Sequence, residues 1–497
     1  MSTSTSVPGL TGIEDSLALI LDCGSDLSRI ESTLLPALRK LCSTVRKDAS
    51  AGSGGRPSGS GSSSSNREGA SQRTPTQETV LCQPIQASVD PLTALDPTAH
   101  SIGMLYILAA RVTHTCTSQD EASALMPHIS AFARLFTLDQ VRLAADKLTQ
   151  LAAAISRVSD LASNPEVGLH ALSTIFSRFV TSSDNLTTLH PQLVYQYLKC
   201  QRYQEAANVL LDTPLIDADT SISPLKHTDV LEYYYYAGLI YTKLERFEDA
   251  MDAFETCVSS PAVAVSAIHM DAYKKLILVQ LLARGKTSPL PKYTSTQITR
   301  TFKQLAESYL TFASVYESRD PASEQYLQRL IQEKQDIFAS DRNTGLVQKC
   351  LSLYRQRRIE RLAGVYSCIS VSEIISLLGL TEPDSATQVL SDINTIIEKG
   401  WIRADVSAAN GNGRDAGSTM VRFSNTPVEK FDTQSGIQLL KASIAHASAW
   451  HKKLQQRDQS LATNPAYLLR VQTAKPDRYG SGTGFGTATD DYDDADY

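Results

Sequence analysis

A short basic loop is the first place where residue types and spacing could do chemistry. Arg284 to Ser288 read RGKTS, like the end of a phosphate-binding loop, in which backbone N–H groups and a lysine hold nucleotide phosphates. The first glycine of such a loop would stand five residues before Gly285, where the chain has Gln280. The preceding LILVQLLA also follows a helical stretch, whereas the loop needs a strand before it. The spacing therefore argues against nucleotide binding.

The sequence also lacks the motifs that indicate a metal site or a catalytic nucleophile. The sequence has no H-E-x-x-H or H-x-H-P motif for zinc and no G-x-S-x-G turn for a nucleophilic serine. Its eight cysteines are scattered without a C-x-x-C pair, which indicates reduced, mostly buried thiols in an intracellular protein. His446 and His451 are five residues apart, so one helix face cannot present both, and we interpret them as surface or interface histidines. We expect no catalytic residue, no metal ligand and no cofactor.

Charge and hydropathy argue against two further classes of partner. The 497 residues carry a formal net charge of −6, so no global positive field would attract nucleic acid or an anionic membrane. The N-terminus has no basic region before its short apolar run, and the longest charge-free apolar run is too short to cross a bilayer. We therefore expect a soluble protein with no membrane partner, whose protein partners have neutral or mixed surfaces.

Helical periodicity dominates the elements that would position any site. Apolar residues recur at three- and four-residue spacing, and no alternating strand pattern appears before about residue 366. Two segments, YLKCQRYQEAA from Tyr197 and YTKLERFEDAM from Tyr241, match at an offset of 44 residues. Each is typical of a helix, a tight turn and a second helix with a small alanine, as in tetratricopeptide-type repeats. We predict a mainly α fold with a helical-repeat solenoid at 81–340.

Four consecutive tyrosines begin at Tyr233 in this region. Four successive helical positions face nearly all directions, so they suit a helix packed between its predecessor, its successor and a partner helix. Each hydroxyl would need a hydrogen-bond partner, such as a helix end or a carboxylate. We interpret these tyrosines as core rather than as a surface on which a ligand stacks.

Two polar stretches divide the chain. A Gly/Ser-rich stretch at 46–80 has almost nothing to bury and predicts a disordered linker, which separates an N-terminal helical segment at 1–45 from the remainder. Residues 472–497 predict a disordered acidic tail, since five of the last eight residues are aspartate.

The pattern changes near residue 341. Three helical segments are followed by WIRADVS, a Gly/Asn-rich loop and TMVRFSN, which is the order of a winged helix at 341–426. A seam of apolar residues on heptad spacing within 427–465 requires another helix against it. The long helix predicted there carries Ile437, Leu440, Ile444, Ala447, Leu454 and Leu461 on this seam.

Nucleic acid is the alternative partner that a winged helix raises. The predicted third helix carries Asp384, Asp392 and Glu398 against Lys399 alone, and DNA phosphates would repel it. The basic run RQRRIER, from Arg355 to Arg361, is more typical of a solvated helix face or of a site for acidic partners. We therefore expect protein partners rather than nucleic acid.

The layout of solenoid, winged helix and long C-terminal helix resembles the PCI-domain proteins of the proteasome lid, the COP9 signalosome and translation initiation factor three. The run from Tyr233 to Lys286, with LPKYTS and DRNTGLVQKCLSLYRQRRIERL after it, is similar to the subunit 3 family of the COP9 signalosome. LDPTAHSIGMLYILA, from Leu95, resembles the same family. The Gly/Ser linker and the wing loop AANGNGRDAGS look like insertions relative to it.

This resemblance implies a non-catalytic scaffold subunit, cytoplasmic and nuclear, in a hetero-oligomer that removes Nedd8 from cullin-RING ubiquitin ligases. Its partners would be other PCI-domain subunits and metalloprotease-domain subunits, with the active site in another chain and the cullin-RING ligases reached through the complex. A scaffold of the proteasome lid or of initiation factor three, or a nucleic-acid-associated PCI protein, is the alternative.

The resemblance also implies two interfaces, since C-terminal helices of such subunits gather into a bundle and their winged helices join edge to edge. The residues facing the bundle would be Ile437, Leu440, Ile444 and Leu454. Those lining the winged-helix edge would be Trp401, Ile402, Val421 and Phe423. For the second set, strand alternation leaves open that the side chains are the internal core of the winged helix.

Overall fold

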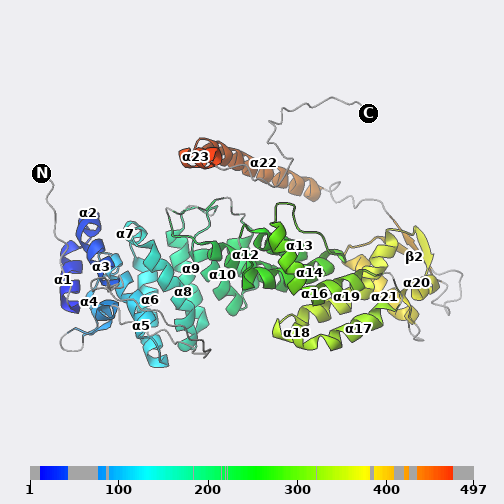
Figure 1. Cartoon of the computed structure of the whole chain (residues 1–497), viewed down its shortest axis with the longest axis horizontal. Helices are drawn as coiled ribbons and strands as arrows, with labels where there is room; N and C mark the ends of the chain where they lie inside the picture. Colours follow the sequence, from blue (N-terminus) through cyan, green and yellow to red (C-terminus); the bar gives the residue numbers. More distant parts are fainter. Residues whose placement is uncertain are drawn as a thin grey trace, which may run out of the picture. The chain divides into compact units, whose positions relative to one another are not determined.

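The chain forms two compact units, Met1–Ser424 and Asn425–Tyr497. The computed structural model describes residues 12–42, 77–85, 89–182, 184–213, 215, 217–218, 220, 222–262, 264–318, 320, 322–380, 385–407, 419–424 and 434–473. Helices of the first unit follow one another in chain order, from the blue α1 to the yellow α21 (Figure 1). The prediction of a mainly α fold with helical repeats is confirmed.

Helices of the first unit have the following bounds. The N-terminal elements are α1 (Ile13–Cys23), α2 (Leu27–Arg29), the π-helical turn η1 (Ile30–Leu34), α3 (Leu35–Cys42) and the 3-10 helix η2 (Gln77–Cys82). The next elements are α4 (Pro91–Ala94), α5 (Ser101–His114), α6 (Gln119–Leu135), α7 (Leu138–Arg142), α8 (Ala145–Leu161), α9 (Pro165–Phe179), α10 (Leu189–Lys199), α11 (Tyr203–Ala206) and the π-helical turn η4 (Ala207–Leu211). The series ends with α12 (His227–Lys243), α13 (Phe247–Ser259), α14 (Ala267–Arg284), α15 (Thr296–Leu305), α16 (Glu307–Glu317), α17 (Ser323–Glu333), α18 (Gln335–Ser340) and α19 (Thr344–Ala363).

One turn recurs between these helices and accounts for the matched sequence repeat. Gln201 after α10 and Glu245 after α12 both adopt the left-handed backbone conformation, with φ of 57° and 61°. The N–H of the following residue then donates to the carbonyl oxygen of Tyr197 or Tyr241, at 3.1 and 3.0 Å. This bond satisfies a carbonyl at the helix end and reverses the chain. The same left-handed conformation recurs at Ser163 and Arg342.

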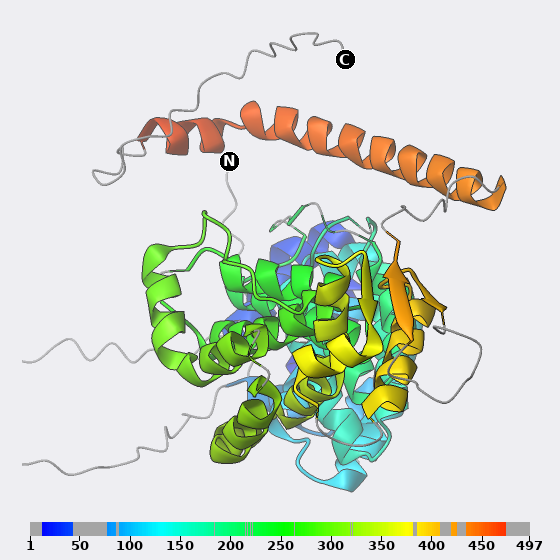
Figure 2. The ribbon, with the colours of Figure 1, turned by 90° about the vertical axis from the view of Figure 1, so that its right-hand side faces the viewer.

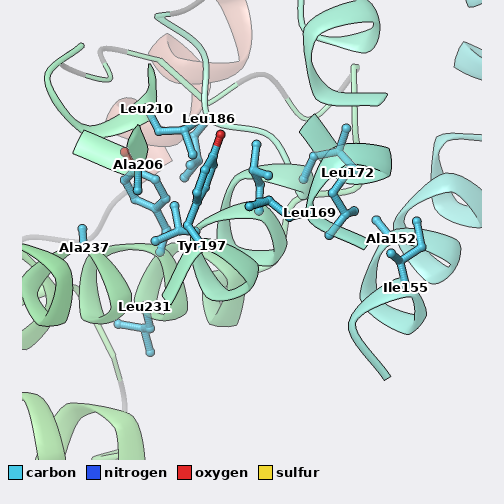
Figure 3. Packing of buried hydrophobic residues seen from close by; sticks show 14 of the residues in the cluster. Ala152, Ile155, Leu169, Leu172, Leu186, Tyr197, Ala206, Leu210, Leu231 and Ala237 are labelled. Carbon is cyan, nitrogen blue, oxygen red and sulfur yellow. The ribbon is translucent and has the colours of Figure 1, made fainter. Parts of the chain in front are cut away.

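Successive helices share one continuous hydrophobic core. Figure 3 shows side chains that enter it from α8, α9, α10 and α12, among them Ile155, Leu172, Tyr197 and Leu231. The cluster of buried residues runs from Ile13 to Tyr354. Each helix pair therefore buries its apolar face against the next pair, as expected of a repeat array.

The four tyrosines of α12 belong to this core. Tyr233 is 4% exposed and packs edge-on against the ring of His190, with ring centres 5.8 Å apart. The ring centre of Tyr236 lies 5.2 Å from that of Tyr195 on α10. The hydroxyl of Tyr235 donates to the carboxylate of Asp271 on α14. Because neighbouring helices flank α12, rings pointing in several directions all find contacts. The core interpretation is confirmed.

The sequence had suggested that the N-terminal helices form a separate piece, but they pack against the rest of the first unit. Ile20 of α1 is 1% exposed, and a Cβ atom on Gly103 of α5 would lie only 2.6 Å from its side chain. The last residues of the predicted linker also belong to the fold, because η2 begins at Gln77 and buries Leu81 completely. The Gly/Ser-rich stretch from 46 to 76 lies outside the described residues.

A second, smaller core follows the repeats. Its elements are β1 (Cys368–Ser370), α20 (Val371–Leu378), α21 (Ser385–Glu398), β2 (Ala404–Ser407) and β3 (Met420–Phe423). The strands form an antiparallel sheet in the order β1-β3-β2, with Val421 opposite both Ile369 and Val406. We interpret this region as a winged helix, although the sequence had predicted a wing of two strands. β1 escaped notice because it has three residues and runs directly into the capped start of α20.

The second unit contains α22 (Gln434–Ala462) and α23 (Pro465–Thr473). Figure 2 shows α22 as one uninterrupted helix followed by the shorter α23. The sequence had not predicted α23, whose start carries Pro465 and the side chain of Asn464, which accepts the Ala466 N–H at 2.9 Å. Residues 427–433, the wing loop at 408–418 and the tail from 474 onward lie outside the described residues. None of the described helices is long and apolar enough to cross a membrane.

Candidate protein-interaction surfaces

The basic loop RGKTS ends a helix and is already occupied by a carboxylate. Gly285 ends α14 in the left-handed conformation, with φ of 67°. Glu317 accepts hydrogen bonds from the Thr287 N–H at 2.6 Å and from its hydroxyl at 2.7 Å. A carboxylate therefore holds the donors that a phosphate would need, and a helix precedes the loop where a nucleotide site requires a strand.

Three of the eight thiols are poorly suited to nucleophilic chemistry. Burial raises the pKa of Cys42 and of Cys82 to about 11 and that of Cys257 to about 12, so these side chains stay protonated near neutral pH. Within the described ranges, no three His, Cys, Asp or Glu side chains are grouped so that they could hold a metal ion. The candidate sites that remain are surfaces that could bind proteins.

The basic run on α19 is not the solvated face that the sequence suggested. Arg357 and Arg358 are only 4% and 9% exposed. Arg357 donates to the carbonyl of Leu282 near the end of α14, and Arg358 donates to the carbonyl of Leu377 near the end of α20 at 2.8 Å. Cations are favourable at helix C-termini, whose carbonyl groups carry partial negative charge. These arginines therefore join the repeat core to the smaller core.

Acidic side chains of the smaller core are engaged at the same joint. Asp392 of α21 lies 3.8 Å from the guanidinium of Arg355, which also lies 3.5 Å from Glu324. The prediction of an acidic third helix holds for Asp392 and Glu398, whereas Asp384 lies outside the described residues. The pairing with Arg355 gives the carboxylate of Asp392 on α21 a partner within the chain.

Residues predicted for the winged-helix edge are mostly buried. Ile402, Val421 and Phe423 are 8%, 0% and 7% exposed and belong to the smaller core. β3 is the central strand, so Val421 and Phe423 do not lie on an edge. Trp401 is half-buried, with the guanidinium of Arg357 3.7 Å from its ring centre. The structure assigns these side chains to the core, the alternative that strand alternation had left open.

β2 is an exposed edge strand of the sheet. Its residues Asp405, Val406 and Ser407 are exposed, and Val406 is 41% exposed. β2 pairs with β3 on one side, and no second strand pairs with it in the described part of the sheet. An edge of this kind offers unpaired backbone groups to another chain.

The apolar seam of α22 is exposed along its length. Ile437, Leu440, Ile444 and Leu454 are 39%, 40%, 56% and 50% exposed. Leu461 continues the seam at 49% exposure. Burying one such side chain fully would contribute about 1.5–3 kcal/mol, so another helix could gain several such contributions along the seam. A hydrogen bond of 2.7 Å from Trp450 Nε1 to His446 Nε2 stays on the helix itself.

Comparison with known proteins gives a consistent relationship. Residues 65–298 match the family described as COP9 signalosome complex subunit 3, N-terminal helical repeats. The protein named COP9 signalosome complex subunit 3 from Arabidopsis thaliana is 29% identical over 397 residues, covering 80% of this chain and 87% of that protein. Its namesake from Drosophila melanogaster is 27% identical over 406 residues, covering 78% of this chain and 86% of that protein.

Proposed function

We propose that this chain is a scaffold subunit of a COP9 signalosome, because residues 65–298 match the helical-repeat family of its subunit 3 and two proteins of that name are similar to the chain over about four-fifths of its length. In this role it has no active site of its own. It supports the removal of Nedd8 from cullin-RING ubiquitin ligases by a metalloprotease-domain subunit, in the cytoplasm and the nucleus.

The observation that carries this proposal is the exposed seam of α22. Side chains such as Ile444 and Leu454 repeat at heptad spacing over a helix of 29 residues, and they stay half exposed or nearly so. A seam of this period fits a bundle with helices of other subunits, since knobs-into-holes packing would bury it. Ile437 and Leu440 extend the same contact toward the start of the helix.

The edge of the sheet supplies a second contact. Strand β2 offers backbone N–H and C=O groups that a neighbouring winged helix could pair with, in the manner of strand addition. The contact differs from the one the sequence implied, because exposed Asp405, Val406 and Ser407 would form it in place of the buried Val421 and Phe423.

Reconstitution with purified signalosome subunits tests the seam. The double variant Ile444→Asp with Leu454→Asp places two charges on it. The matched control, Ala449→Asp with Gln456→Asp, adds the same charges at exposed positions on the opposite side of α22. We expect the seam variant to drop out of the complex in size-exclusion chromatography and to lower Nedd8 release from neddylated cullin, while the control assembles.

Two results would contradict the proposal. One is wild-type chain that joins no signalosome subunit but copurifies with proteasome lid or initiation factor subunits. The other is a seam variant that assembles as well as the control, which would show that α22 is not the bundle contact.

A further inference from the structure

The joint between the two cores contains an open pocket that the scaffold contacts above do not use. It has a volume of about 420 Å³ and lies at the end of α19, beside the last turn of α20. The residues that matter for its chemistry are Arg358, Arg361, Leu362, Val365, Tyr366 and Leu377. Its size lies within the range of roughly 300–1,000 Å³ that is usual for ligand pockets.

Large apolar side chains that line this pocket are exposed. Val365, Tyr366 and Leu377 are 70%, 39% and 37% exposed, although all three are large hydrophobic residues. A turn fixes the first two, because their N–H groups both donate to the carbonyl oxygen of Leu362, at 3.0 and 2.9 Å. The chain thus holds apolar side chains out at a defined place, which is typical of a protein-interaction site.

Arg361 brings positive charge and spare hydrogen-bonding capacity to the same pocket. Arg361 donates one N–H to the carbonyl of Glu317, at 3.3 Å, and one to the carbonyl of Gly285. A guanidinium has five N–H donors, so about three remain without a partner among the described residues. The acidic chain neighbour Glu360 pairs with Arg357, at 2.6 Å, and no carboxylate pairs with Arg361 in that part of the chain.

We propose that this joint pocket binds a segment of a partner subunit in which a large apolar side chain stands next to an aspartate or glutamate. The apolar side chain packs among Leu362, Val365 and Leu377, and the carboxylate pairs with Arg361 in the forked geometry that guanidinium groups favour. Tyrosine and arginine on the rim suit such a contact, since both are enriched where binding energy concentrates in protein interfaces.

A protein segment fits better than a small ligand because the pocket is open and its apolar residues project from the surface. This inference rests on the proposed scaffold function, and it adds the chemistry of one partner. It places a contact at the joint, and movement of the smaller core against the repeats would change that contact.

Val365→Asp is the sharpest test. The side chain is 70% exposed, so the change should leave folding intact, and it puts a carboxylate at the mouth of the pocket that would compete for Arg361 and repel an acidic partner. Leu305→Asp is the matched control, since Leu305 is 62% exposed at the end of α15 and does not line the pocket. Affinity of the full-length chain for each purified signalosome subunit would be measured by biolayer interferometry.

We expect Val365→Asp to weaken binding to one subunit at least tenfold and Leu305→Asp to change it less than twofold. A photo-crosslinking amino acid at Tyr366 in the full-length chain should then capture, from that subunit, a segment with a large apolar residue beside Asp or Glu. Replacing that acid by Arg should restore binding to the Val365→Asp chain.

The joint pocket proposal fails if wild-type chain assembles and Val365→Asp binds every subunit within twofold of the control. It fails also if the captured segment has no carboxylate beside its apolar residue. If wild-type chain binds no signalosome subunit at all, the proposed scaffold function fails as well, so the two failures are distinguishable.

Discussion

Helices α21 and α22 have similar apolar periodicity but opposite environments. Ile393 and Ile396 of α21 are both 0% exposed, within the core that α19, α20 and the sheet share. Ile444 and Leu454 of α22 are 56% and 50% exposed. The same kind of stripe is therefore satisfied within the chain in one helix and left accessible in the other. No described residue of its own unit covers the stripe on α22, and an exposed apolar stripe of this kind is typical of an interaction site.

This comparison separates stability from assembly. In the first unit a buried apolar side chain contributes to the folding of this chain. On α22 such a side chain would contribute to the proposed complex, and the isolated chain should hardly depend on it. Changes at the two places should thus differ in what they damage, and the following predictions test that difference.

The largest effect is expected from Phe254→Ala. Phe254 is 0% exposed and fills the space beside Gly238, where a Cβ would come within 2.7 Å of its ring. Emptying this site should lower the free energy of unfolding by about 3–5 kcal/mol. The paired variant Leu454→Ala should change it by less than about 0.5 kcal/mol while weakening assembly. Urea denaturation checks both, and equal losses in the isolated chain would remove the distinction between the core of the first unit and the seam of α22.

Arg357→Ala should have the next largest effect. Its guanidinium stacks on Trp401, pairs with Glu360 at 2.6 Å and donates to the carbonyl of Leu282. Removing it leaves the buried carbonyl of Leu282 without this donor and the partly exposed Glu360 without its partner, at a cost of about 2–4 kcal/mol. Thermal unfolding of Arg357→Ala beside that of Arg300→Ala, an exposed arginine on α15, measures this. If both variants unfold at the wild-type temperature, the arginines do not join the two cores.

Acid should weaken the repeat core through His190. Burial lowers the pKa of this imidazole to about 4, and its Nδ1 accepts the N–H of Thr187 at 3.0 Å. The folded state favours the neutral ring, whereas the unfolded chain takes up a proton below about pH 6.5. The contribution to stability is therefore complete above pH 6.5 and is lost as pH falls toward 4, by up to about 1.4 kcal/mol per pH unit.

The change His190→Gln should flatten this dependence, because glutamine does not titrate. His170→Gln, at an exposed position of α9, is the matched control and should leave the slope as in wild type. Chemical denaturation between pH 4.5 and 7.5 supplies the measurement. An unchanged slope in His190→Gln would assign the acid sensitivity to other groups.

The smallest effect is expected at the recurring turn. Gln201 holds φ of 57°, a conformation that glycine adopts without strain. We expect Gln201→Gly to stabilise the chain by up to about 1 kcal/mol. Glu245→Gly should gain less, since Glu245 also pairs with Lys349 at 2.7 Å. A loss of stability in Gln201→Gly would mean that the side chain itself holds the turn.

Much of the fold was accessible to sequence reasoning, because helices and turns depend on residues close in the chain. The 44-residue match predicted two tight turns, and the structure gives both turns the same hydrogen bond, beside Gln201 and Glu245. The heptad spacing from Ile437 to Leu461 predicted a long helix with an apolar seam. The missing glycine at Gln280 argued against a nucleotide site, where Glu317 now occupies the donors.

The missed features depend on contacts between distant residues. Glu78, read as part of a linker, is 7% exposed and pairs with Lys147 at 2.7 Å. Its burial depends on a residue far along the chain, and polar composition alone gave no sign of it. The joint pocket likewise brings Arg361 of the basic run together with Leu377 from another helix, which the sequence had not singled out.

The sequence by itself determined the helical class of the fold from its apolar period, and it carried the family resemblance that the comparisons also found. Only the tertiary structure decided which apolar and charged residues are accessible. It buried Val421 in a central strand, placed Arg357 on helix ends, and left Ile444 and Val365 exposed. The physical reason is that periodicity is a local property, whereas burial depends on which distant segment covers a side chain.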